Sequence, residues 1–175
     1  MTDPAWTKHD LGWWLGNFTR TAFRLETLDR YRSDDEDTWF EEWRRTGALP
    51  VFTPENDPWC KHIAKVRAEG RLIQRVHLVS PPPPDYVRFE FACQEASVAA
   101  GEDCRVAHRH QHPQLHEFKT DFWLFDAQTV IVLKYDSEGR FLEALPVDGD
   151  VAKYRRIRDL AMSYSISLKE YLATL

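Results

Sequence analysis

A histidine-rich stretch in the second half of the chain holds the densest group of side chains that could do chemistry. His108, His110 and His112 alternate along the chain, so in an extended segment their three imidazoles point to the same side. Neutral imidazole is a good zinc ligand, and Glu117 could complete a shell with these candidate ligands. The spacing, however, matches no recognised structural zinc motif, and Pro113 favours an exposed polar loop. We therefore expect no cofactor, and no stoichiometric zinc in the purified chain.

A second possible site would combine arginine, histidine and carboxylate side chains that lie far apart in the sequence. Asp121 stands at the start of an apolar strand, where it could pair with Arg105 or Arg109. Such a pair is more often structural than functional. Arg75 and Glu90 can be interpreted in the same way, as residues of structural ion pairs. The candidate binding residues are Arg75, Tyr86, Glu90, Arg105, Arg109, His116 and Asp121.

The sequence contains few signals of nucleophilic catalysis. It has no GxSxG elbow and no glycine-rich phosphate loop, and it uses only 7 glycines. Cys60 and His62 are two residues apart on a predicted helix, so they do not face each other. Cys93 falls on the predicted inner face of another helix, where a free thiol is usually inert. The sequence favours a protein without catalytic residues.

The composition limits the classes of partner. Of the 175 residues, 43% are hydrophobic and 13% aromatic, which is enough for a core. A formal net charge of -5 argues against general nucleic-acid binding. The 3 cysteines have no CxxC spacing and fit reduced thiols. Neither a secretory signal nor a long apolar run is visible. We expect a soluble cytoplasmic protein that binds neither nucleic acid nor membranes.

The elements that must position these residues centre on a helix–strand–helix unit. Asp57-Pro58 is typical of a helix start, and residues 72–78 alternate as a strand with one buried face does. Asp85 opens a second helix after four prolines, and residues 108–120 are predicted to be a loop. Further strands are predicted at 103–107, 122–126, 129–135 and 140–145, with a hairpin turn at 136–139 and a helical tail from residue 148.

This order of elements predicts an α+β fold with a central, mostly antiparallel sheet and helices packed on it. We expect an α+β domain over residues 51–175 and a helical N-terminal extension over residues 1–50, the two forming one structural unit.

The N-terminal segment is unusually aromatic, with Trp6, Trp13, Trp14 and Phe18 close together. Each such side chain removes on the order of 150–250 Å² from water when it is covered. Two interpretations stay open. The aromatic residues could form an interface with a protein partner or a second copy of the chain, or the first helix could dock on its own sheet.

Several short motifs connect the sequence to a family. They are Phe-Arg-Leu-Glu over residues 23–26, Trp59, Arg-Val-His-Leu-Val over 75–79, Asp85-Tyr86 with Glu90, Ala-Gly-Glu over 100–102, Arg105, Asp-Phe-Trp-Leu-Phe-Asp over 121–126, and Gly139. Together they resemble a family of small, uncharacterised, mainly actinobacterial proteins commonly encoded beside helix-turn-helix regulators. The resemblance spans residues 18–171. It implies no activity, but it implies a regulatory setting in which such a regulator is a possible partner.

The predicted fold also resembles half of a phospholipase D-like domain. That superfamily requires His-x-Lys with a downstream Asp, whereas here Lys119 stands one residue too far from His116. Because side chains alternate along a strand, Lys119 would face the opposite side. The resemblance therefore implies such a fold with its activity lost.

Three functions are consistent with the sequence. The first is a non-catalytic regulatory protein of the bacterial cytoplasm that binds another protein or itself. The second is a phosphoesterase-like enzyme that uses a polar arginine, histidine and aspartate site. The third is a metal-dependent binder that uses the histidine-rich stretch.

Overall fold

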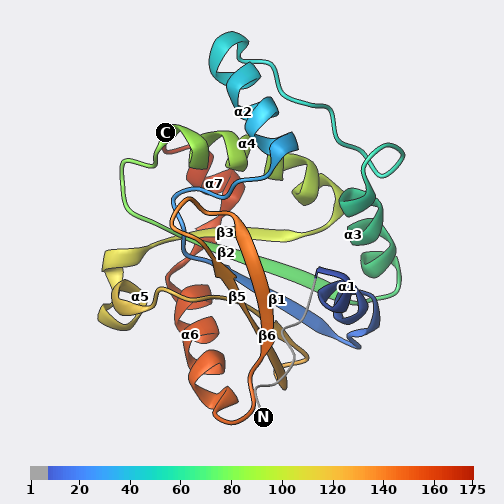
Figure 1. Cartoon of the computed structure of the whole chain (residues 1–175), viewed down its shortest axis with the longest axis vertical. Coiled ribbons are helices and arrows are strands. Elements are labelled where there is room, and N and C mark those ends of the chain that lie inside the picture. The colour runs from blue at the N-terminus through green and yellow to red at the C-terminus, as the bar shows by residue number, and fades with distance from the viewer. Residues whose placement is uncertain (1–7) are drawn as a thin grey trace.

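A mixed seven-stranded sheet forms the centre of the part of the chain described by this computed structural model, residues 8–175 (Figure 1). The strands are β1 (Thr21–Glu26), β2 (Leu72–Val79), β3 (Asp103–His108), β4 (Asp121–Phe125), β5 (Thr129–Tyr135), β6 (Phe141–Pro146) and β7 (Ile166–Ser167). Their spatial order is β6-β5-β4-β1-β2-β3-β7. The β1–β2 and β2–β3 pairs are parallel and the other pairs are antiparallel. The predicted α+β class with a mostly antiparallel sheet is confirmed.

Helices cover both faces of this sheet. They are α1 (Lys8–Asn17), α2 (Asp34–Thr46), α3 (Pro58–Ala68), α4 (Asp85–Ala100), α5 (Pro113–Glu117), α6 (Val151–Tyr164) and α7 (Leu168–Leu172), with a short 3-10 helix at Arg109–Gln111. On one face, Leu25 and Val76 pack against Leu115 of α5 and Ile157 of α6. Figure 1 shows α2 at one end of the molecule, where it extends beyond the sheet.

The opposite face carries α1, α3, α4 and α7, and its apolar packing is divided into two parts. Ile73 and Trp123 pack with α1 and α3 residues toward one side, whereas Val79 and Cys104 pack with α4 and α7 residues toward the other. Between these two apolar clusters, the strands present charged side chains to the helices. The site described below lies in this gap.

Local sequence explains where the helix that begins the central unit starts. The Asp57 carboxylate accepts a hydrogen bond of 2.7 Å from the backbone N–H of Cys60, and Pro58 occupies the first turn of α3. The helix ends at Ala68, and Gly70 follows with a φ of 77°. The predicted helix start is confirmed.

Two predictions of local structure are wrong. Residues 21–26, expected within a helical segment over residues 1–50, form β1, which lies between β4 and β2. The charged Arg24 and Glu26 make the strand hard to recognise in the sequence. In the structure, Phe23 and Leu25 are buried on the opposite face of this strand. Residues 108–120, expected to be a loop, contain the 3-10 helix and α5, in which Pro113 provides a favourable first turn.

The turn between β5 and β6 is formed as predicted and is pressed against the segment that follows β1. Gly139 has a φ of 84°, and its N–H donates to the Asp136 carbonyl over 3.1 Å. The Gly139 carbonyl accepts from the Arg32 N–H over 3.0 Å. A methyl group on Gly139 would collide with the carbonyl oxygen of Arg30. This position therefore requires glycine both for its conformation and for its lack of a side chain.

We predict that Gly139→Ala destabilises the protein more than Gly47→Ala does. Gly47 has a similar φ of 74° but nothing within 4 Å of the position that a methyl group would take, so its substitution costs conformational strain alone, about 1 kcal/mol. The collision at Gly139 should add about 1–3 kcal/mol. Urea denaturation of both variants measures this difference, and equal losses of free energy of unfolding would contradict the close approach.

Candidate functional site

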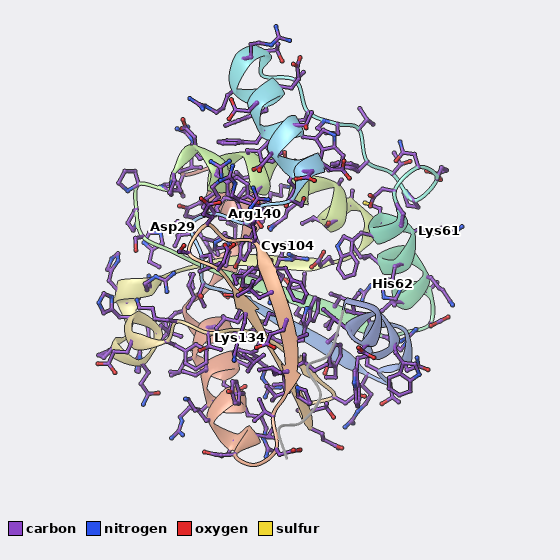
Figure 2. The ribbon with its side chains drawn as sticks, in the orientation of Figure 1. Asp29, Lys61, His62, Cys104, Lys134 and Arg140 are labelled. Carbon is purple, nitrogen blue, oxygen red and sulfur yellow. The ribbon has the colours of Figure 1, made fainter. Side chains whose placement is uncertain are left out.

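Charged side chains from two adjacent strands meet inside the molecule. Alternation places Arg24 and Glu26 of β1 on the α4 side of the sheet, and the parallel register sets them beside Arg75 and His77 of β2. His77 is fully buried, and Arg24 and Glu26 are each 4% exposed. Figure 2 labels Cys104, the β3 residue paired with Arg75, near the middle of the molecule. Burying so many charges costs free energy unless they are paired.

Arg75 forms ion pairs with two carboxylates, one of which also binds a side chain of α3. Its guanidinium donates to Oε1 of Glu26 and, over 2.8 Å, to Oε1 of Glu102. The other oxygen of Glu102 accepts a hydrogen bond of 3.1 Å from the Trp59 indole. Burial opposes ionisation of Glu26, but the positive charges of Arg75, His77 and Arg24 outweigh it and hold the pKa of this carboxyl below its ordinary range.

Asp121 forms a second, fully satisfied centre one strand away. Its carboxylate accepts from Arg24 over 2.9 Å, from the N–H and hydroxyl of Thr27, and from the Tyr31 hydroxyl over 2.5 Å. Arg24 also donates to the Tyr135 hydroxyl over 3.0 Å. These contacts connect β1, β4 and β5 around one carboxylate.

The centre of the site is less well satisfied. Nδ1 of His77 lies 3.5 Å from Oε2 of Glu26 and 3.4 Å from Oε2 of Glu90, which reaches in from α4. All three atoms are buried and have no hydrogen-bond partner. Within residues 8–175, these three side chains form the one group whose ligand-type atoms all lie within 4.8 Å of one another.

The poor pairing shifts the pKa values of Glu90 and His77. Burial and the negative charge of Glu26 raise the pKa of the Glu90 carboxyl to about 8. Burial alone would lower the pKa of His77, but the charges of Glu90 and Glu26 raise it to about 9. Both shifts indicate that the site is short of positive charge.

Two cavities open on this charged centre. One, of about 300 Å³, lies among α2, α3 and α4, and its walls include Trp39, Phe52, Trp59, Phe89 and Gln94. The other, of about 430 Å³, lies over β1, β4 and β5, and its walls include Arg24, Glu26, Tyr31, Trp123 and Tyr135. Glu36, Arg75 and Glu90 line both cavities. The buried charges are thus reachable from two sides.

Two cysteines line the smaller cavity without being activated. Burial and the neighbouring Asp57 raise the pKa of the Cys60 thiol to about 11. Burial and the charge of Glu36 raise the pKa of the Cys93 thiol to about 12. Because the thiolate is the nucleophile, both residues are poorly suited to covalent chemistry at neutral pH.

The structure brings together four of the seven candidate binding residues. Arg75 and Glu90 belong to the charged centre, Asp121 is connected to it through Arg24, and Tyr86 donates to Glu36 at the cavity wall over 3.3 Å. Asp121 thus pairs with Arg24, and not with the expected Arg105 or Arg109.

The other three candidates lie elsewhere. Arg109 donates to the backbone carbonyls of Thr27 and Leu78. Arg105 donates to Ser165 near the β7 edge of the sheet. His116 is exposed on α5. These three side chains form no common site with Asp121.

Sequence reasoning missed Arg24, Glu26 and His77. The available signal was the alternation of charged Arg24 and Glu26 with apolar Phe23 and Leu25. Alternation of this kind indicates a strand with one polar face. That the polar face would be buried under α4 could not be inferred from alternation.

The histidine-rich stretch is organised as a local turn. His112 caps α5 by accepting a hydrogen bond of 3.2 Å from the Gln114 N–H, and the rings of His108 and His110 lie 5.6 Å apart. His110 is exposed. Among the described residues, these histidines are not part of a group with metal-ligand geometry.

The N-terminal aromatic residues divide between core and surface. Phe18 is buried, and Trp14 stacks on Phe125 with ring centroids 5.8 Å apart. Trp13 is 59% exposed, and Trp6 lies outside the described residues. Helix α1 therefore docks on its own sheet through Trp14, with Phe18 buried just after the helix, while Trp13 leaves apolar surface uncovered.

The fold and the site together define an α+β protein with a buried, partly unpaired charged centre between two cavities. The chain belongs to the family described as Domain of unknown function (DUF6879), whose model matches residues 9–173. No curated protein matches the sequence. No helix in residues 8–175 has the length and apolar character needed to cross a membrane. The likeness to a phospholipase D-like half-domain stays a prediction.

We predict that the free energy of unfolding falls as the pH rises from 6 to 9 in metal-free buffer. The pKa values of Glu90 and His77 rise from 4.5 to about 8 and from 6.5 to about 9 on folding. In this range the folded protein therefore retains protons that the unfolded chain has released, and raising the pH favours unfolding. The slope reaches at most about 1.4 kcal/mol per pH unit for each proton.

Urea denaturation at several pH values measures this slope. Glu90→Gln should flatten it, because glutamine does not titrate. Glu95→Gln, on the exposed side of the same helix, should leave it unchanged. Equal slopes in the two variants would show that Glu90 does not hold an additional proton.

Proposed function

We propose that this protein is a non-catalytic regulatory protein of the bacterial cytoplasm that binds a small molecule in the smaller cavity. The observation that carries the proposal is the convergence of two cavities on buried polar atoms without partners. A concave site with apolar walls and a few convergent polar groups is the usual form of a ligand pocket.

The lining of the smaller cavity suggests the chemical class of the ligand. Trp39 and Phe52 form an edge-to-face pair with ring centroids 5.3 Å apart, and Trp59 and Phe89 add further aromatic surface. The Nε2 group of Gln94 is buried and has no partner. These features favour a ligand with a flat apolar body and a polar end that reaches the buried polar groups.

Helix α2 offers a means of response. Its residues Glu36 and Trp39 line the cavity, while Phe40 anchors the helix on Tyr86 and Phe89 of α4. A ligand that contacts Glu36 and Trp39 binds with different affinity to conformations of the protein that differ in where α2 lies. Such a difference in affinity is what allows a ligand to shift a conformational equilibrium. We place the protein partner at this helix or at exposed Trp13. A second copy of the chain and a helix-turn-helix regulator are both open as that partner.

Two further arguments support a regulatory role. The sequence resembles small actinobacterial proteins encoded beside helix-turn-helix regulators. The cavity thiols have raised pKa values. Of the residues expected for a phosphoesterase site, Arg75 lines the two cavities, whereas Arg105, Arg109 and His116 line neither. The three free cysteines are in keeping with a reducing compartment.

We predict that filling the cavity weakens ligand binding. A fragment screen by protein-observed NMR should yield compounds that shift the indole N–H signals of Trp39 and Trp59 but not of exposed Trp13. Ala96→Leu adds bulk to the cavity wall and should weaken the best compound at least about tenfold.

The matched control is Ala99→Leu, which adds the same side chain to the exposed side of α4 and should bind normally. A fragment screen without hits at Trp39 and Trp59 would contradict the proposal. So would hits that bind Ala96→Leu as well as they bind the unmodified chain.

A further inference from the structure

The ring of His77 is held in one tautomer. Its Nε2 lies 2.9 Å from the backbone carbonyl oxygen of Leu28. A carbonyl oxygen only accepts hydrogen bonds, so Nε2 carries a proton and donates it. In the neutral ring Nδ1 therefore carries a lone pair, and this lone pair faces the carboxylate oxygens of Glu26 and Glu90. Three acceptor atoms directed at one another require a cation or protons between them.

The distances favour a metal ion over a shared proton. A normal N–H···O bond spans about 2.7–3.2 Å, whereas Nδ1 lies 3.4 Å and 3.5 Å from the two oxygens. Zinc bonds to nitrogen and oxygen of about 2.0–2.2 Å at tetrahedral angles separate neighbouring ligand atoms by about 3.3–3.6 Å. Both distances fall within this range. The two carboxylate oxygens lie within 4.8 Å of each other, so a single ion can contact all three atoms after small side-chain adjustments.

The local charge leaves room for a divalent cation. Four carboxylates, from Glu26, Glu90, Glu102 and Asp121, face two guanidiniums, from Arg24 and Arg75. Glu36 adds a further carboxyl group at the cavity wall. With His77 neutral and all four carboxylates ionised, as after a metal ion has displaced their protons, the four carboxylates and two guanidiniums leave an excess of two negative charges. A divalent ion cancels that excess.

The groups around the three atoms match those that support metal ligands in proteins. Metal-binding histidines almost always donate their other ring N–H to a carbonyl or carboxylate, as His77 does to Leu28. Arg75 donates to Oε1 of Glu26, which orients Oε2 toward His77. The ligands come from β1, β2 and α4, so each is fixed by regular structure.

We infer that Glu26, His77 and Glu90 bind one divalent transition metal ion of the zinc class. The donor set of one imidazole nitrogen and two carboxylates suits such ions. Glu26 and Glu90 both line the larger cavity, so a water molecule or a ligand group can occupy the remaining coordination position. This site goes beyond the proposed ligand cavity and does not depend on it. It also differs from the histidine-rich stretch, and it departs from the sequence-based expectation that the purified chain holds no stoichiometric zinc.

Metal titration of the full chain tests the site. After dialysis against a chelator, calorimetry with Zn²⁺ should give one ion per chain, and Co²⁺ should give the visible absorption of a low-symmetry site with nitrogen and oxygen ligands. Zinc affinity should rise between pH 6 and 8, because the metal displaces protons from its ligands. Glu90→Gln should weaken Zn²⁺ binding at least about tenfold.

Two controls separate this site from other zinc ligands. Glu95→Gln changes an exposed carboxylate on the same helix and should bind Zn²⁺ as the unmodified chain does. The triple variant His108→Ala, His110→Ala, His112→Ala should also retain the ion. Absence of stoichiometric binding in the folded unmodified chain would overturn the inference. Binding that survives Glu90→Gln but is lost in the triple variant would overturn it equally.

Discussion

The ion pairs of Arg75 hold the centre of this protein together. One guanidinium connects Glu26 of β1 to Glu102, the residue before β3, and Glu102 in turn accepts a hydrogen bond from the Trp59 indole of α3. Removing one partner of such a buried pair leaves an uncompensated charge, which commonly costs about 3–5 kcal/mol. The parallel strands and the helix above them therefore depend on a single guanidinium that pairs with two carboxylates.

The same network is incompletely neutralised where α4 brings in Glu90. Asp121 has all its contacts within the protein, whereas the atoms of Glu26, Glu90 and His77 that face one another have none. Proteins commonly violate the rule of satisfied buried polar groups at functional sites. The location of this violation, between two cavities, is the strongest structural reason to assign it a binding role.

The two proposals assign different roles to neighbouring parts of one site. The aromatic cavity beneath α2 suits an organic ligand, and the three buried ligand-type groups suit an ion. Glu90 belongs to both, because it lines each cavity and faces His77. An ion at this position would fix the ionised form of Glu90 and so alter the polar end of the cavity. Coupling between the two sites would then follow from a shared carboxylate.

The sequence by itself determined the α+β class, the start of α3 at Asp57-Pro58, the presence of β2 and the turn at Gly139, because each depends on residues close together in the chain. It predicted one buried face for β2, but Val76 to Val79 are buried on both faces because α4 covers the second one. It also identified Arg75, Glu90 and Asp121 as candidate binding residues. Only the tertiary structure decided that β1 is a strand and that residues 26, 77 and 90 meet. The parallel register and the packing of α4 on the sheet create this meeting, and both depend on contacts between distant residues that no local pattern records.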